Sequence, residues 1–282
     1  MKKTDKILIV GLGLIGGSYA EGLTFKGYQV YAIDTNEESI KFAKNKKIII
    51  DGSTDIKKEF LETFDIIIFA LYPHIMVEWI KKYQDYLKPN TIITDATGIK
   101  KWLYNEIKPI LRKDIEFIGG HPMAGREVYG VENSNKDIFK NANYIITPTD
   151  ESTEYAINTV KKIAEELEFK NIEILSMETH DEMIGFLSQL THCIAISLMT
   201  CKESKHLVKY TGDSFRDLTR IAKINENMWS ELFLLNKEEL LQQMDLFLNK
   251  FEELKKTIED DDVDTMKEIM KLSTLNRSYF DK

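Results

Sequence analysis

The residue types best suited to chemistry lie in residues 119–127, Gly-Gly-His-Pro-Met-Ala-Gly-Arg-Glu, directly after a short apolar run. His121 is the side chain of this segment that ordinarily titrates near neutrality, so it can act as a general base or acid. The glycines let the backbone bend close to a small molecule. The pattern favours a catalytic loop with His121 as the proton acceptor. A structural, hydrogen-bonded histidine is the alternative interpretation.

A second segment, residues 11–16, has the GxGxxG pattern after an apolar run and before a helical pattern. This is the context that a dinucleotide-binding turn requires. The glycines allow a tight turn and close approach of a pyrophosphate, to which the helix N-terminus offers N–H groups. The residues expected to bind the cofactor here are Gly11, Leu12, Gly13, Leu14, Ile15 and Gly16.

Asp34 follows the predicted strand 29–33, about 20 residues beyond the glycines. A carboxylate at this place accepts hydrogen bonds from the ribose 2′-hydroxyl and repels a 2′-phosphate, which predicts NAD rather than NADP. The alternative is that Asp34 merely caps the next helix, with Thr35 and Asn36.

The segment after the predicted strand 65–70 is expected to turn beneath the cofactor. Leu71, Tyr72 and Pro73 are therefore expected to line the NAD cleft. His74, which follows them, is expected to be an exposed loop residue.

Short apolar runs alternate with amphipathic segments through the first part of the chain. Such runs suit strands buried on both faces of a parallel sheet. They are residues 7–10, 29–33, 65–70, 91–94, 115–118, 143–147 and 172–175. Segments such as 38–45 and 75–87 are long enough to be crossover helices. The alternation predicts a doubly wound, mostly parallel sheet in a Rossmann-like α/β domain over residues 1–176.

Helical patterns replace the strand-like runs after Ser176, so we expect an all-α domain over residues 177–282. Residues 186–199 are apolar nearly all round, which predicts a helix buried on every side. Farther on, apolar residues recur with a heptad-like spacing typical of a helix–helix contact. They are Leu240, Met244, Phe247, Phe251, Leu254 and Ile258. These features suit a dimerisation domain, though they would also serve a monomeric bundle.

The 282 residues are 43% hydrophobic and 30% charged, enough for a folded core. A formal net charge of −8, without a compact basic cluster, argues against a nucleic-acid or membrane-surface partner. We find no run of about 18 uncharged apolar residues such as a membrane span needs. Cys193 and Cys201 lack metal-ligand spacing and are interpreted as core thiols of a reducing, cytoplasmic compartment. No metal is expected, and an anionic ligand would need a few placed positive groups.

These segments together resemble the bacterial prephenate dehydrogenases of tyrosine biosynthesis, over essentially the whole chain. The resemblance rests on residues 11–18, on Gly-His-Pro-Met-Ala-Gly-x-Glu at 120–127, and on 215–222 followed by Met228-Trp229. Residues 188–192, Ser-Gln-Leu-Thr-His, resemble the family's Ser-His-Leu-Pro-His. The resemblance implies an oxidative decarboxylation that converts prephenate and NAD to 4-hydroxyphenylpyruvate, CO2 and NADH.

The resemblance also implies a role for each matching residue. His121 would accept the proton of the ring hydroxyl, and Arg220 would hold a substrate carboxylate with paired hydrogen bonds. His192 would contact the pyruvyl side, although a histidine in an apolar helix is otherwise a core residue. Glu127 would hold Arg220 in place, and Trp229 would form a wall of the site.

The chain departs from the family pattern at two places. Gly98 stands where many members have a serine that bonds to the substrate hydroxyl or to the catalytic histidine. Thr97, next to it, is kept as a catalytic candidate because it could supply a hydroxyl. Gln189 replaces a histidine and is kept as a substrate-binding candidate. Because a neutral Gln189 could tolerate an ammonium group, arogenate dehydrogenase is the nearest alternative.

Two other classes of protein fit the sequence less well. A β-hydroxyacid dehydrogenase would need a catalytic lysine, which residues 186–199 lack. A non-catalytic NAD-binding sensor would be expected to lose His121 or Arg220. We expect neither a regulatory ACT domain nor a chorismate mutase domain, and we therefore expect any tyrosine feedback to act at the active site. A homodimer formed through the helical domain is expected.

Overall fold

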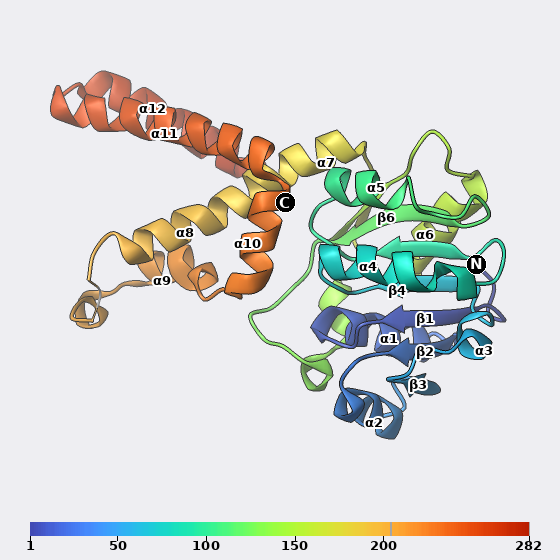
Figure 1. Cartoon of the computed structure of the whole chain (residues 1–282). Helices are drawn as coiled ribbons and strands as arrows, with labels where there is room; N and C mark the ends of the chain where they lie inside the picture. The colour runs from blue at the N-terminus through green and yellow to red at the C-terminus, as the bar shows by residue number, and fades with distance from the viewer. Residues whose placement is uncertain (204, 282) are drawn as a thin grey trace.

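The computed structural model describes residues 1–203 and 205–281, and over these residues the chain forms an eight-stranded sheet followed by helices (Figure 1). The strands are β1 (Lys6–Val10), β2 (Gln29–Ile33), β3 (Asp51–Ser53), β4 (Ile66–Phe69), β5 (Ile92–Asp95), β6 (Glu116–Pro122), β7 (Asn143–Thr147) and β8 (Asn171–Ile174). Their order across the sheet is β3-β2-β1-β4-β5-β6-β7-β8. Neighbouring strands are parallel apart from β6 and β7, which are antiparallel. The prediction of a doubly wound, mostly parallel sheet is confirmed.

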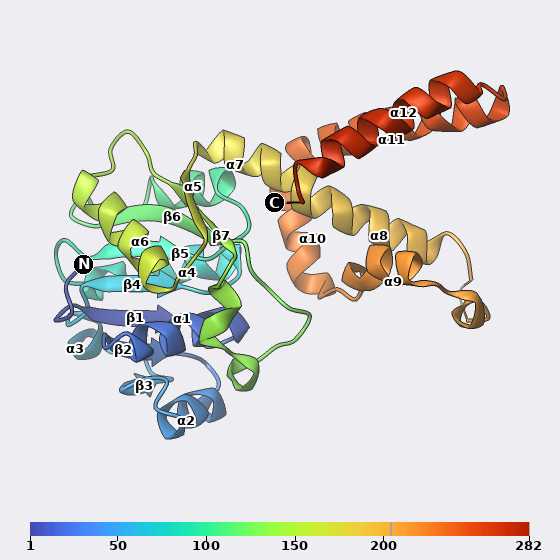
Figure 2. The ribbon, with the colours of Figure 1, turned by 180° about the vertical axis from the view of Figure 1, so that it is seen from behind.

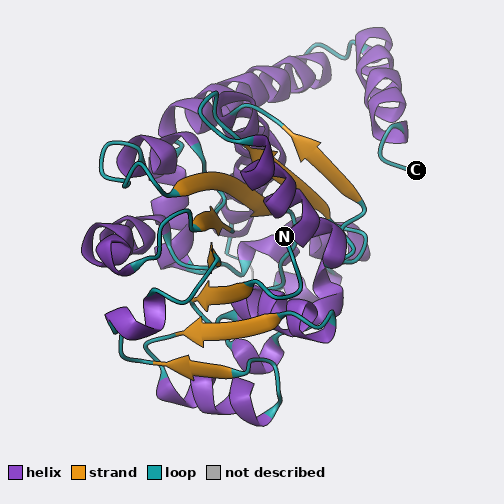
Figure 3. Cartoon of the chain, turned by 90° about the vertical axis from the view of Figure 1, so that its right-hand side faces the viewer, coloured by secondary structure: helices purple, strands orange, loops and turns teal. Residues whose placement is uncertain are grey.

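Helices cover both faces of this sheet (Figure 3). They are α1 (Leu14–Phe25), α2 (Glu37–Asn45), α3 (Lys58–Leu61), α4 (Pro73–Tyr83), α5 (Lys101–Ile107) and α6 (Glu154–Glu166), with short 3-10 turns at Gln84–Tyr86, Val131–Asn133 and Lys136–Phe139. Ile7 and Ile9 of β1 point into the apolar cluster that contains α1 and α6 residues. Leu8 and Val10 point into the cluster under α4 and α5. Because side chains alternate along a strand, a strand covered on both faces has to be apolar at consecutive positions.

The second half of the described chain is helical, as predicted. It contains α7 (Met177–Ile184), a π-helical turn (Gly185–Leu190), α8 (Thr191–Thr200), α9 (Asp213–Thr219), α10 (Glu226–Leu235), α11 (Lys237–Glu259) and α12 (Val263–Ser278), with 3-10 turns at Leu207–Tyr210 and Arg220–Ala222. Helices α11 and α12 lie side by side and project as an arm from the rest of the molecule (Figures 1 and 2). The division at residues 176 and 177 stays a prediction, and it would fall between β8 and α7.

Three local predictions differ from the structure. β3 and α3 were not expected, because they are too short and too polar to show an apolar run. β6 extends to Pro122, so His121 lies in a strand opposite Ile145 rather than in a loop. Glycines in a sequence argue against a strand, but here Gly120 is required by close packing. A Cβ on Gly120 would lie 2.2 Å from the Tyr144 hydroxyl.

The predicted fully buried helix at 186–199 is only partly covered within one chain. Phe186 is 50% and Leu187 is 49% exposed. The continuous helix Met177–Thr200 is long and apolar enough to cross a membrane, and 28% of its most apolar stretch is buried. Length and composition therefore do not exclude a span here, contrary to the sequence-based expectation. The same properties suit a helix that packs against other protein.

The heptad-like residues of α11 also remain uncovered toward the end of the arm. Leu240 is buried, whereas Phe251 and Ile258 are 58% and 60% exposed. Cys201 is exposed as well, so the expectation that both cysteines are core thiols is wrong for it; Cys193 is half-buried. Hydrophobicity in a sequence cannot distinguish burial within a chain from burial between chains.

Candidate active site

The glycine turn between β1 and α1 has the geometry of a dinucleotide site. Gly11 adopts φ +97°, and a Cβ there would lie 2.5 Å from the Ala70 carbonyl oxygen. A Cβ on Gly16 would lie 1.9 Å from the Gly11 carbonyl oxygen. By contrast, a Cβ on Gly13 would have no atom of another residue within 4 Å. Packing therefore requires Gly11 and Gly16, while Gly13 leaves open space at the start of α1, which fits a pyrophosphate.

Asp34 lies at the carboxyl end of β2 and is tied to the glycine turn. Its Oδ2 accepts a hydrogen bond from the Leu12 N–H at 2.6 Å, and its Oδ1 accepts one from the Asn36 N–H at 2.8 Å. The cap of α2 is Asn36, whose side chain accepts from the Glu38 N–H. Asp34 is thus not the cap itself, and its carboxylate lies beside the turn that would hold the cofactor.

The segment after β4 lies against the same turn. The Leu71 side chain comes within 2.9 Å of the position that a Gly11 Cβ would take. Pro73 is the first residue of α4. The Tyr72 hydroxyl accepts a hydrogen bond from Asn225 Nδ2 of the helical half at 3.2 Å. These three residues therefore stand between the glycine turn and the helical half.

His74 was expected in an exposed loop, but it lies in the first turn of α4 and contacts the helical half. Its Nδ1 is 2.7 Å from Oε1 of Glu231, which also accepts from the His74 N–H at 3.0 Å. Its ring lies 4.6 Å from that of Trp102, measured between centroids. The helix-initiating Pro73 explains the difference, because proline is favoured in the first turn of a helix.

His121, which is partly buried, is the first member of a chain of hydrogen-bonded groups whose other members, His180 and Asp181, are buried. Its Nδ1 is 2.8 Å from His180 Nε2, and His180 Nδ1 is 2.6 Å from Asp181 Oδ1. Burial lowers the pKa of His121 well below the ordinary histidine value, and the neighbouring His180 and Lys100 act in the same direction. At neutral pH the His121 imidazole is therefore neutral, as a general base must be.

His180 and Asp181 were missed by the sequence analysis. Both are buried on α7, and His180 is 59 residues from His121 in the chain. Burial also lowers the pKa of His180, partly offset by its hydrogen bond to Asp181. The adjacent His-Asp pair was the only sequence signal, and nothing in the sequence connects it with His121.

Asp95, at the end of β5, anchors the strand that carries His121. Its Oδ1 accepts from the Gly120 N–H at 3.0 Å. Its Oδ2 accepts from the Thr97 N–H at 2.9 Å and from Lys100 Nζ at 2.5 Å. Burial lowers the pKa of Lys100, and the Asp95 carboxylate opposes that shift. Asp95, paired with Lys100, thus holds the backbone N–H of Gly120, the residue next to His121.

Thr97 does not replace the serine that the family pattern has at Gly98. The Thr97 hydroxyl is bonded to Asp95 Oδ2 and accepts from Lys100 Nζ at 3.1 Å, so it belongs to the buried network. A Cβ on Gly98, by contrast, would lie 3.9 Å from His121 Cε1. Position 98 faces the base, whereas the Thr97 side chain is turned away from it.

Gln189 is likewise unavailable to a substrate. Its side chain is buried, with Nε2 donating to the Leu232 carbonyl at 3.1 Å and Oε1 accepting from Asn236 Nδ2 at 2.8 Å. Both ends of the amide are used in helix packing. The proposed tolerance of an ammonium group at this residue is therefore wrong.

The other candidate substrate-binding residues form a partly exposed cluster, in which His192 and Trp229 are half-buried. Arg220 Nη1 donates to Glu127 Oε1 at 2.5 Å, and the two side chains are 66% and 37% exposed. His192 Nδ1 is 2.8 Å from the Ser188 carbonyl, and its ring stacks on Trp229 with 3.7 Å between centroids. Burial lowers the pKa of His192. Among its charged neighbours, Glu127 raises that pKa and Arg220 lowers it. A cation beside an aromatic wall suits a substrate that has a carboxylate and a ring.

Helix α10 joins these parts. Trp229 belongs to the partly exposed cluster, and Glu231 binds His74. Leu232 would lie 3.7 Å from a Cβ on Gly98, which itself faces His121. The candidate site therefore lies where α10 meets the carboxyl ends of the strands (Figure 1). Arg216, on α9, pairs with Asp213 and is exposed.

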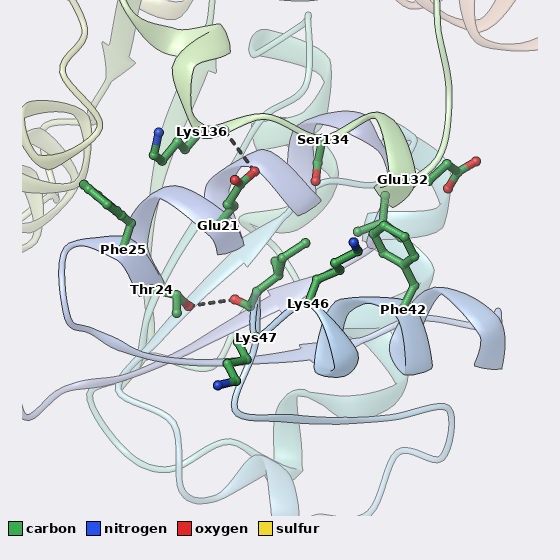
Figure 4. Close-up of a pocket in the computed structure, with 11 residues that line it drawn as sticks. Glu21, Thr24, Phe25, Phe42, Lys46, Lys47, Glu132, Ser134 and Lys136 are labelled. Atoms are coloured by element: carbon green, nitrogen blue, oxygen red, sulfur yellow. Dashed lines mark hydrogen bonds between the residues drawn. The ribbon is translucent and has the colours of Figure 1, made fainter.

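A surface pocket of about 380 Å³ lies elsewhere, between the far end of α1, α2 and the Val131–Asn133 turn (Figure 4). Its lining includes Thr24, Phe25, Phe42 and Lys46, and none of the predicted site residues. Within the part of the chain that the structure describes, no cluster of three or more His, Cys, Asp or Glu side chains could hold a metal ion.

A nucleotide-binding sheet that carries a neutral histidine, joined to a helical domain that carries an arginine, defines a two-domain NAD-dependent dehydrogenase. Residues 20–173 match the family model of the prephenate dehydrogenase nucleotide-binding domain, and residues 176–272 match that of the prephenate dehydrogenase dimerization domain. The chain belongs to the prephenate dehydrogenase family.

Similar proteins agree with this assignment. The chain is 32% identical over 256 residues to a prephenate dehydrogenase of Lactococcus lactis, covering 88% of this chain and 70% of that protein. It is 28% identical over 269 residues to the Bacillus subtilis enzyme, covering 93% and 72%. The crystal structure of the A. aeolicus prephenate dehydrogenase in complex with hydroxyphenyl propionate and NAD+ superposes with a TM-score of 0.89 at 32% identity, over 99% of both chains.

Proposed function

We propose that this protein converts prephenate and NAD to 4-hydroxyphenylpyruvate, CO2 and NADH, with His121 as the general base. The observation that carries the proposal is the position of His121 at the domain junction, with its Nδ1 2.8 Å from His180 Nε2. Its Nδ1 is occupied by His180, which leaves Nε2 for the substrate. A positioned base of this kind contributes about 10²–10⁴ in rate.

The reaction removes a proton and a hydride from the same carbinol group. His121 accepts the proton of the ring hydroxyl. NAD, when bound at the glycine turn, would accept the hydride from the carbon that bears this hydroxyl. The bond between the ring and its carboxylate then breaks, and its electron pair completes the aromatic ring as CO2 leaves. His121 returns its proton to the ring oxygen, which gives the phenol and restores the neutral base.

The substrate carboxylates need a local positive charge, because the chain as a whole carries a net charge of −8. Arg220 is the proposed clamp. Its guanidinium has five N–H donors, of which Glu127 takes one in the structure. Glu127 thus orients Arg220, and Trp229 offers its ring as a wall. His192, whose Nδ1 side is bonded to Ser188, is proposed to contact the pyruvyl group through Nε2.

The proposed NAD site is the surface formed by the glycine turn, Asp34 and the segment after β4. Its residues are Gly11, Leu12, Gly13, Leu14, Ile15, Gly16, Asp34, Leu71, Tyr72 and Pro73. The open space at Gly13 would take the pyrophosphate, and the Asp34 carboxylate would accept from the ribose hydroxyls.

Initial rates of NADH formation with prephenate and with arogenate, measured side by side, test the proposed substrate. We expect turnover with prephenate. Faster turnover of arogenate, or no turnover of either, would contradict the proposal. Gln189, which is buried and bonded to Asn236, is not placed to contact an ammonium group.

We also propose that the protein is a homodimer formed through its helical half. The exposed apolar residues of the π-helical turn, α11 and α12 support this, since an isolated chain would leave them in water. Light scattering coupled to size exclusion should give twice the 32.8 kDa chain mass. A monomer at micromolar concentration would contradict the dimer. A cytoplasmic location and the lack of a nucleic-acid or membrane partner stay predictions.

A further inference from the structure

We infer that His180 and Asp181 are positioning residues that set the tautomer of His121 and share the proton it accepts. The two residues lie outside the segment that matches the nucleotide-binding domain, on the first helix of the helical half. The inference rests on the proposed function, because it requires His121 to be the base.

The hydrogen-bond chain has a single consistent assignment when both histidines are neutral. Asp181 Oδ1 and Oδ2 each accept a backbone N–H, from Lys100 and Lys101, both at 2.9 Å, so the carboxylate acts as an acceptor. His180 must then donate from Nδ1 to Asp181, which makes its Nε2 an acceptor. His121 must therefore donate from Nδ1, and its Nε2 has the lone pair. Asp181 thus determines, through His180, which nitrogen of His121 can take a proton.

The surroundings hold this chain in place. His180 and Asp181 are 0% and 2% exposed. The two N–H groups that bind Asp181 belong to the start of α5, and the Asp181 carbonyl accepts from Asn236 Nδ2 at 3.0 Å. The pair is therefore attached to the sheet domain at one end and to the junction of α10 and α11 at the other. A side chain fixed in this way loses little freedom when substrate binds.

The same chain can take up the charge created by the reaction. When His121 Nε2 accepts the substrate proton, the ring becomes cationic in a buried place that already contains the Lys100 ammonium group. Transfer of the Nδ1 proton from His121 to His180 Nε2 leaves His121 neutral. The positive charge then lies on His180, next to the Asp181 carboxylate. One proton enters the chain and none is lost, so the transfer reverses when the phenol oxygen takes its proton back.

Selective ¹⁵N labelling of histidine tests the inference directly, since the chain has 5 histidines. In the native protein we expect His121 to be protonated at Nδ1 and unprotonated at Nε2. The His121 signals are assigned as those that disappear from the spectrum of His121→Asn. In His180→Phe, which offers no acceptor, the His121 signals should show a mixture of tautomers. In His180→Gln, whose amide oxygen can accept from His121 Nδ1, the native tautomer should return.

Kinetics of the same variants should follow the tautomer. We expect kcat of His180→Phe to fall at least about 10-fold, short of the ~10⁴-fold that a wrong tautomer can cost a catalytic histidine. KM for prephenate and the Kd of NAD should stay at their native values in His180→Phe. His180→Gln should recover part of the native kcat. His206→Phe, an exposed histidine, is the matched control and should leave kcat unchanged.

The outcomes separate this inference from the proposed function. An Nε2–H tautomer of His121 in the native protein, which needs no variant to fold, overturns the inference. A native kcat in His180→Phe also overturns the inference. If the native protein turns over prephenate normally in that case, the proposed function is unaffected. No turnover of prephenate by the native protein, with the expected tautomer, overturns the function instead.

Discussion

The charged and imidazole groups around His121 are buried and hydrogen-bonded, whereas Arg220 and Glu127 are exposed. Each of four residues is at most 2% exposed: Asp95, Lys100, His180 and Asp181. Arg220, by contrast, is 66% exposed and pairs with Glu127. The contrast indicates that the proton acceptor is organised before substrate arrives. The carboxylate clamp remains accessible, so that an anion can reach it from water.

The largest expected effect comes from the buried side of this comparison. In His121→Asn the general base is lost, so kcat should fall at least ~10²-fold. NAD and prephenate should still bind, because asparagine keeps a polar group of smaller volume at the same strand position. Stopped-flow NADH absorbance and binding titrations measure the two quantities. Near-native kcat would show that His121 is a structural residue.

A large effect on binding is expected from the exposed side. Arg220→Ala removes charge-assisted hydrogen bonds of about 1.5–3 kcal/mol each, which predicts a KM for prephenate about 10- to 100-fold higher. The unfolding free energy should change by less than about 1 kcal/mol, because the Glu127 pair is exposed. Arg216→Ala, on the neighbouring helix, is the matched control. A lowered Tm with native KM would instead mark Arg220 as structural.

An intermediate effect is expected at the cofactor turn, which combines a buried hydrogen bond with an open binding surface. Asp34→Ala should weaken NAD binding about 10-fold, because it removes a charged acceptor of the ribose hydroxyls and the tether to the Leu12 N–H. Discrimination against NADP should weaken as well. Calorimetric titration with both dinucleotides measures this. Unchanged NAD affinity would remove Asp34 from the site.

The smallest effect is expected at Gly98, on the boundary between the two regions. A Cβ there meets Leu232 at 3.7 Å and His121 at 3.9 Å, which are ordinary contacts, so Gly98→Ser should fold. Its hydroxyl would add about one hydrogen bond beside the base and raise kcat by at most about 5-fold. Gly98→Ala is the control for the added volume. Equal kcat in the two variants would show that no such bond forms.

The sheet could be predicted because its chemistry is repetitive. A strand covered on both faces must be apolar at consecutive positions, and β1, β4 and β5 show this directly. β3 has three residues, Asp51–Ser53, and no such pattern. The helix 186–199 could be predicted as a helix, but its degree of burial depends on what covers it, and sequence does not contain that information.

The candidate site could be predicted only in part, for a related reason. His121 and Arg220 lie in motifs whose residue types indicate their chemistry. Thr97 and Gln189 were chosen by position in a motif, yet their side chains point into packing. His180 and Asp181 act through contacts between segments that are distant in the chain, and only the folded structure brings them to His121.

The pH dependence of kcat/KM for prephenate tests the central claim most directly, because it reports on the base in the free enzyme. His121 is active when neutral, so activity is lost as pH falls through its pKa. Since burial lowers that pKa, the acid limb should lie well below pH ~6.5, the ordinary histidine value, and should disappear from the residual activity of His121→Asn. A limb at or above ~6.5, or one that persists unchanged in His121→Asn, would contradict a neutral, partly buried His121 as the base.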